Sequence, residues 1–184
     1  MGILNAKGKY IVRMDPDDTF NKDKINLQLK YMRENNADIC FTNMNVNNKL
    51  INYPKTKLQI IKKLGLGFNP IAHASVIYKR ELFTTRVVYN EDCDYAEDFD
   101  LWVKALINSK KFVHFDKPLT NYSIDNTINK TRNNAKAQIR IRSQYIVKLA
   151  LIIVPLFTGL ICNLFRLFIP FHYSTLYFFG SKKK

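Results

Sequence analysis

RMDPDD, residues 13–18, directly follows the segment GKYIV, which has the composition of a short strand. It places Asp15, Asp17 and Asp18 together in a chain with 29 Lys+Arg and only 15 Asp+Glu. Crowded carboxylates destabilise a protein unless a cation or a set of donors lies among them. The stretch therefore predicts a metal site at the end of a short buried strand, with a helix cap carrying spare surface acids as the alternative.

The residues that follow predict an α/β unit. We expect a strand within 8–15, a helix over about 21–34 capped by Thr19 or Asn21, and a strand over 37–46. The apolar stripe of this helix would be Ile25, Leu29 and Met32. Ligands of open α/β sheets gather at the carboxyl ends of the strands, which is where the acidic cluster lies.

A second set of elements is expected farther along the chain. The helix over 95–108 has the clearest pattern, because Phe99, Trp102, Val103 and Leu106 fall on one face. The remaining elements are a helix over 56–65 that stops at Gly65, an extended segment over 71–79, two short strands in KFVHF and PLTNYS, and a basic helix over about 131–148.

The charge of the chain is uneven. The formal net charge is +14, and residues 126–184 contain ten basic residues and no acidic one. Residues 149–165 carry no charge, and a stretch of this length is at the lower limit for crossing a bilayer. Basic residues flank the apolar region at both ends, which favours a re-entrant hairpin or an interfacial helix pair over a single span. A buried C-terminal helix pair is the alternative.

These patterns also bear on partners. A basic helix beside an apolar segment favours an anionic membrane surface, whereas no nucleic-acid-binding motif is present, so we expect no nucleic acid partner. Cys40, Cys93 and Cys162 are far apart and predict reduced thiols. The N-terminus is polar and does not resemble a signal peptide.

Four segments resemble one family. AKGKYIVRMDPDD (6–18), NPIAHASVIYKRELF (69–83), YAEDFDLWVKAL (95–106) and KPLTNYSI (117–124) are similar, in order and spacing, to segments of family 2 glycosyltransferases with the GT-A fold. Ser123 stands where that family often has an arginine. The resemblance implies an α/β fold class, a partial GT-A domain over 1–128 that lacks its first strands. A basic amphipathic helix would follow over 129–148, and a membrane-associated apolar segment with a basic tail over 149–184.

The resemblance also implies an activity. Such a protein transfers a sugar from a nucleotide-diphosphate sugar, here expected to be UDP-linked, to a glycan or lipid-linked acceptor at the bacterial cell surface, with inversion. The cofactor would be a divalent cation, Mg²⁺ or Mn²⁺, because hard cations stabilise a departing diphosphate and take oxygen ligands. The expected location is the cytoplasmic face of the membrane.

The resemblance assigns roles to five residues. Asp17 and Asp18 would contact the metal and the ribose, with Asp15 supporting them. Asp98 would be the base that takes the acceptor proton, and Glu97 would orient the acceptor. The alternative for Glu97 and Asp98 is that acids in a first helical turn stabilise the helix dipole.

Three further residues have a role and an alternative. Arg13 could offset the charge of the acidic cluster or reach a phosphate, with a solvated strand end as the alternative. Core packing is the expected role of Trp102, although the resemblance places it near the acceptor. A structural role is expected for His73, with lining of the acceptor site as the alternative.

One part of the family pattern is missing. By the resemblance, roughly 75–90 residues of nucleotide-binding strands and helices would precede residue 1. We therefore expect activity only if that half is supplied. The competing hypotheses are an inactive truncated remnant, a membrane-bound partner without catalysis, and, less favoured, a basic nucleic-acid-binding protein.

Overall fold

The computed structural model describes residues 2–16, 18–84, 87–90, 93, 95–122 and 128–145. Asp17 and the apolar segment 149–184 lie outside these residues, so the predictions made for them stay predictions. The elements in chain order are α1 (Gly2–Asn5), β1 (Tyr10–Val12), β2 (Thr19–Phe20), α2 (Lys24–Glu34), β3 (Ile39–Val46), β4 (Lys49–Ile51), α3 (Lys57–Gly65), η1 (His73–Ser75), β5 (Ile77–Lys79), η2 (Arg80–Thr84), α4 (Glu97–Ile107), β6 (Phe112–Tyr122) and α5 (Ile128–Tyr145).

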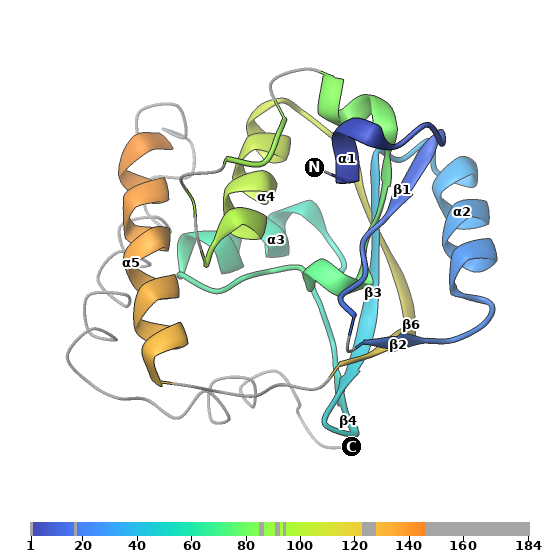
Figure 1. Ribbon diagram of the computed structural model, residues 1–184, viewed down its shortest axis with the longest axis horizontal. Helices are drawn as coiled ribbons and strands as arrows, with labels where there is room; N and C mark the ends of the chain where they lie inside the picture. Colours follow the sequence, from blue (N-terminus) through green and yellow to red (C-terminus); the bar gives the residue numbers. More distant parts are fainter. Residues whose placement is uncertain are drawn as a thin grey trace.

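One mixed sheet organises these elements. Its strand order is β1-β5-β3-β6-β2, and β4 pairs with the C-terminal end of β3. β3 and β6 run parallel, and the other strand pairs are antiparallel. α2 lies on one side of the sheet, and α3, α4 and α5 lie on the other (Figure 1). The expected α/β class is confirmed.

Two sequence predictions for strands were incomplete. The two predicted short strands form one strand, β6, which contains residues 112–115 of the first and 118–122 of the second, and its register against β3 shifts around Asn43. Residues 71–79 are extended only in part, because His73–Ser75 form a 3-10 turn before β5. The turn brings His73 and Ala74 to the pocket described below.

The buried face of α2 differs from the predicted stripe. Lys24, Gln28 and Met32 are fully buried, whereas Ile25 is 37% exposed. Lys24 and Gln28 can be buried because they form hydrogen bonds with each other and with a backbone carbonyl. Lys24 Nζ donates to Gln28 Oε1 (2.5 Å) and to the Ser75 carbonyl (3.2 Å), and Gln28 Nε2 donates to the same carbonyl (3.0 Å). A periodicity argument counts such residues as exposed, and this tertiary contact overrides it.

Helix starts were predicted with mixed success. The N-cap of α2 is Asp23, without a side-chain cap bond, rather than Thr19 or Asn21. Asn21 instead forms a turn just before the helix, since its Oδ1 accepts from the Asp23 amide (2.9 Å). α3 begins at a capping box. The Thr56 hydroxyl accepts from the Gln59 backbone amide, and the Gln59 side-chain oxygen accepts from the Thr56 backbone amide.

α4 is the centre of the core. Its predicted apolar face is confirmed: Phe99, Trp102, Val103 and Leu106 are each at most 8% exposed. α5 packs on α4 through its own buried Ile141 and Arg142.

The basic helix therefore does not present all its charge to solvent. The Arg142 guanidinium lies 4.6 Å from the centroid of the Phe99 ring and donates to the Leu64 carbonyl (3.0 Å). Lys136 and Arg140 on the same helix are exposed. Within the part of the chain that the structure describes, none of the helices is long and apolar enough to cross a bilayer.

Candidate active site

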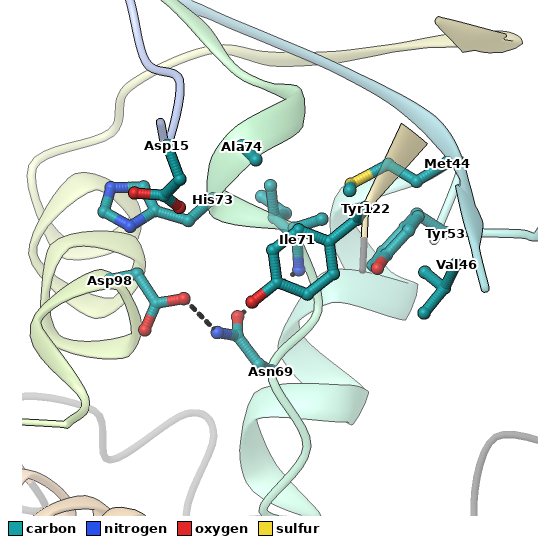
Figure 2. A pocket seen from close by; sticks show the side chains of 11 residues that line it. Asp15, Met44, Val46, Tyr53, Asn69, Ile71, His73, Ala74, Asp98 and Tyr122 are labelled. Carbon is teal, nitrogen blue, oxygen red and sulfur yellow. Dashed lines mark hydrogen bonds between the residues drawn. The ribbon is translucent and has the colours of Figure 1, made fainter. Parts of the chain in front are cut away.

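A pocket of about 150 Å³ lies where the loop after β1 meets the start of α4. Figure 2 shows Asp15, His73 and Asp98 on one side of it, and the aromatic and apolar side chains of Tyr53, Tyr122 and Met44 on the other. The full lining is Asp15, Met44, Val46, Tyr53, Asn69, Ile71, Ala72, His73, Ala74, Asp98 and Tyr122. The fold thus brings one residue of each predicted acidic motif to a single pocket.

Asp98 stands at the first turn of α4 and has an unusual acidity. Burial, and next the neighbouring charge of Glu97, raise the pKa of its carboxyl from 3.8 to about 7. Hydrogen bonds oppose this rise: the Phe99 amide donates to Oδ1 (2.7 Å), and the Asn69 side-chain amide donates to Oδ2. A carboxyl with a pKa near neutrality can both take and return a proton, as a general base requires.

Asn69 connects Asp98 to the core. Its Oδ1 accepts from the indole Nε1 of Trp102 (3.0 Å), while its Nδ2 donates to Asp98. Trp102 is fully buried and lies one helical turn beyond Asp98 on α4. Core packing is therefore one role of Trp102, and a polar link to the pocket is a second.

His73 is held in its neutral form. Burial, with the positive charge of Arg13 as a smaller cause, lowers the pKa of its ring from 6.5 to about 3. Its Nε2 lies 2.5 Å from the Tyr89 hydroxyl, which lies 3.2 Å from that of Tyr78. The 3.8 Å approach of His73 Nδ1 to Glu97 Oε1 is accordingly a polar contact and not a full ion pair.

Asp15 and Asp18, two members of the acidic cluster after β1, lie in different surroundings. Asp15 lines the pocket, and its carboxylate pairs with Arg13 (2.5 Å). Asp18 is buried, does not line this pocket, and donates its backbone amide to the Asp15 carbonyl (3.2 Å). Among the described residues, which leave out Asp17, no group of three His, Cys, Asp or Glu side chains could hold a metal ion. Metal binding by Asp17 and Asp18 stays a prediction.

Some pocket residues were assigned no role from the sequence. Asn69 lies within NPIAHAS, and Tyr122 within KPLTNYS, yet neither pattern points to a function by itself. Tyr53 and Met44 come from the segment after β4 and from β3 itself. Glu97 begins α4 beside Asp98, and its side chain is 44% exposed.

Comparisons with known proteins agree with one another. The family model described as "Glycosyl transferase family 2" matches residues 1–96. An uncharacterized glycosyltransferase of Rickettsia conorii is 30% identical over 139 residues, which are 70% of this chain and 22% of that protein. One of Methanocaldococcus jannaschii is 30% identical over 148 residues, 76% of this chain and 49% of that protein.

A solved structure shares the fold. TarS 1–349 of S. aureus, in complex with UDP-GlcNAc, superposes with a TM-score of 0.62 at 17% identity, covering 84% of this chain and 49% of that one. This chain thus spans between about a fifth and a half of the length of the relatives it matches. The family model covers more than half of this chain, and the chain belongs to glycosyl transferase family 2.

Proposed function

We propose that this chain carries the acceptor-activating part of a site that transfers a sugar from a nucleotide-diphosphate sugar to a hydroxyl acceptor. The observation that carries the proposal is Asp98, a carboxyl with a pKa of about 7 in a pocket that Asp15 also lines. Family membership supports sugar transfer as the reaction class.

The proposed step is a single displacement. The Asp98 carboxylate takes the proton of the acceptor hydroxyl while the oxygen attacks the anomeric carbon of the donor. The bond from that carbon to the diphosphate oxygen breaks, and the nucleotide diphosphate leaves with the electron pair. Attack from the face opposite the leaving group inverts the configuration. Glu97 would hold the acceptor beside Asp98.

The proposed donor is UDP-linked. TarS has been solved with UDP-GlcNAc and with UDP, which supports a donor of that class. A divalent cation needs only one or two protein carboxylates when phosphate and water supply its other ligands. Asp15 offers such a carboxylate at the pocket, with Asp17 and Asp18 next to it in sequence. A cation there would stabilise the charge that develops on the diphosphate, and Arg13 would add a positive group beside it.

The acceptor and the location are further parts of the proposal. We take the acceptor to be a cell-surface glycan or a lipid-linked sugar, reached at the cytoplasmic face of a bacterial membrane. The exposed Lys136 and Arg140 of α5 support contact with anionic lipid, where each basic residue near the surface contributes about 1 kcal/mol. An inactive remnant or a non-catalytic membrane partner is the competing function.

The test uses Asp98→Asn in the full-length protein. Donor binding is measured by calorimetry with UDP-sugars and Mn²⁺, starting with UDP-GlcNAc, and turnover is measured as released UDP. We expect unchanged donor binding and a turnover loss of about 10²–10⁴-fold, since the base is lost. The control is Asp116→Asn, which alters an exposed carboxylate paired with Lys55. Full turnover by Asp98→Asn would refute the proposal, and no turnover by the unaltered protein would favour the non-catalytic alternative.

A further inference from the structure

Asn69 occupies a position between a rigid core residue and the carboxylate of the pocket. Its amide oxygen accepts from the Trp102 indole N–H. Its amide nitrogen faces Asp98 Oδ2 (Figure 2). An indole N–H is a donor only, so the oxygen of the Asn69 amide must be the atom that points to Trp102. The NH₂ group is then directed at Asp98. Trp102 fixes which way the amide faces.

We propose that Asn69, oriented by the Trp102 indole N–H, is the positioning residue that holds the Asp98 carboxylate in its proton-accepting state. This inference rests on the proposed role of Asp98 as the base. It adds to that role two residues that act through Asp98.

The hydrogen-bonding capacities support this reading. An NH₂ group can only donate, so its bond to Asp98 Oδ2 favours the charged carboxylate over the protonated carboxyl. The Phe99 amide donates to the other oxygen, Oδ1, and the two bonds together fix the plane of the carboxylate. Each oxygen keeps a second lone pair that can take the proton of an acceptor hydroxyl. The network thus orients the base and favours its charged form.

The same hydrogen bonds lower the pKa of Asp98 and so oppose the effect of burial. Burial and Glu97 raise the pKa of its carboxyl, and the Asn69 bond is the first of the hydrogen bonds that lower it. Without Asn69 the carboxyl would hold its proton at neutral pH. Among the described residues, the other titratable or charged groups that face Asp98 or its pocket are Glu97, Tyr78, Tyr89, His73, Asp15, Arg13, Tyr53 and Tyr122.

The test is a direct titration of Asp98 that needs no substrate. The protein is labelled with ¹³C at the aspartate side-chain carboxyl, and Asp98→Asn identifies the Asp98 resonance. In Asn69→Ala we expect the Asp98 pKa to rise by about one pH unit, because a hydrogen bond to a charged group is lost. In Trp102→Phe, which keeps an aromatic ring but removes the N–H, we expect a smaller rise, because the amide can rotate.

Matched controls separate positioning from general destabilisation. Asn108→Ala removes another partly buried asparagine amide, which donates to the Lys104 carbonyl at the end of α4. Val103→Ala removes buried volume next to Trp102 on the same helix. Neither should move the Asp98 titration. An Asn69→Ala titration no different from that of Asn108→Ala would overturn the inference, as would a Trp102→Phe titration no different from that of Val103→Ala.

A turnover profile separates this inference from the proposed function. For a one-unit rise in pKa, turnover of Asn69→Ala should fall about five-fold near pH 7 and recover near pH 9. A pH-independent loss would overturn the positioning role and leave the transfer function standing. Turnover that survives Asp98→Asn would instead refute the function itself.

Discussion

Replacing Asp98 with Asn should make the fold more stable relative to the unaltered protein as pH rises from about 4 to 8, while it removes activity. The unfolded carboxyl has a pKa near 3.8, and the folded one about 7. The folded state therefore binds more protons between these values, and the stability of the unaltered protein falls as pH rises from about 4 to 7. The difference corresponds to about 4 kcal/mol, which partial exposure to the pocket reduces to about 2–4 kcal/mol.

The asparagine variant has no such charge to bury. It does lose one acceptor oxygen, because the Asn69 amide and the Phe99 amide each donate to a separate oxygen of Asp98. An unpaired donor costs about 1–3 kcal/mol at every pH. Near pH 4 the variant should thus be the less stable protein, and near pH 8 it should equal or exceed the unaltered one.

Urea denaturation at the two pH values measures this difference. The quantity of interest is the change, between pH 4 and pH 8, in the free energy of unfolding of Asp98→Asn relative to the unaltered protein. We expect that change to favour the variant by about 2–4 kcal/mol. Asp116→Asn is the control, because Lys55 lowers the pKa of that exposed carboxyl and the change should have the opposite sign. An equal free-energy difference at both pH values would refute the argument that Asp98 is held in a costly, base-like state.

Three further substitutions test interactions that stabilise the fold. Burial lowers the pKa of Lys24 to about 8, so the unfolded chain binds more protons than the folded one between pH 8 and 10.5. The free energy of unfolding should therefore rise over that window by about 3 kcal/mol. In Lys24→Met, urea denaturation curves should lack this rise. Arg142→Met should cost about 1–3 kcal/mol in urea denaturation, because the buried guanidinium bond to the Leu64 carbonyl is lost. Thr56→Ala should lower the free energy of unfolding by about 1 kcal/mol, as expected for the loss of a helix cap.

Much of the fold could be predicted from the sequence where burial follows a simple period. The face of α4 was predicted correctly because Phe99, Trp102 and Leu106 recur at helical spacing and the helix buries that face. The face of α2 was predicted only in part: Met32 is fully buried as expected, but Lys24 and Gln28 are also buried, by hydrogen bonds to a carbonyl distant in sequence. Periodicity carries no information about such a partner.

The candidate site, like the fold, could be predicted from the sequence only in part. Asp15 was selected because crowded carboxylates follow a strand end, whereas Asp98 was selected through the resemblance of its helix to that of family 2 glycosyltransferases. The fold places both on one pocket. Their chemical roles stay predictions. Asn69 and Tyr89 belong to loops without periodicity, so only the tertiary structure reveals that they contact Asp98 and His73.

We propose that Asp15 and Asp98 belong to one transfer site, with cation and diphosphate near the first and acceptor near the second. NMR of the full-length protein with UDP-GlcNAc tests this arrangement when Mn²⁺ is added, since this ion broadens the signals of nearby amides. We expect broadening at Met14–Asp15 and also at Asp98–Phe99 that depends on the nucleotide sugar. Broadening at only one of the two segments, or at neither, would contradict the proposed arrangement.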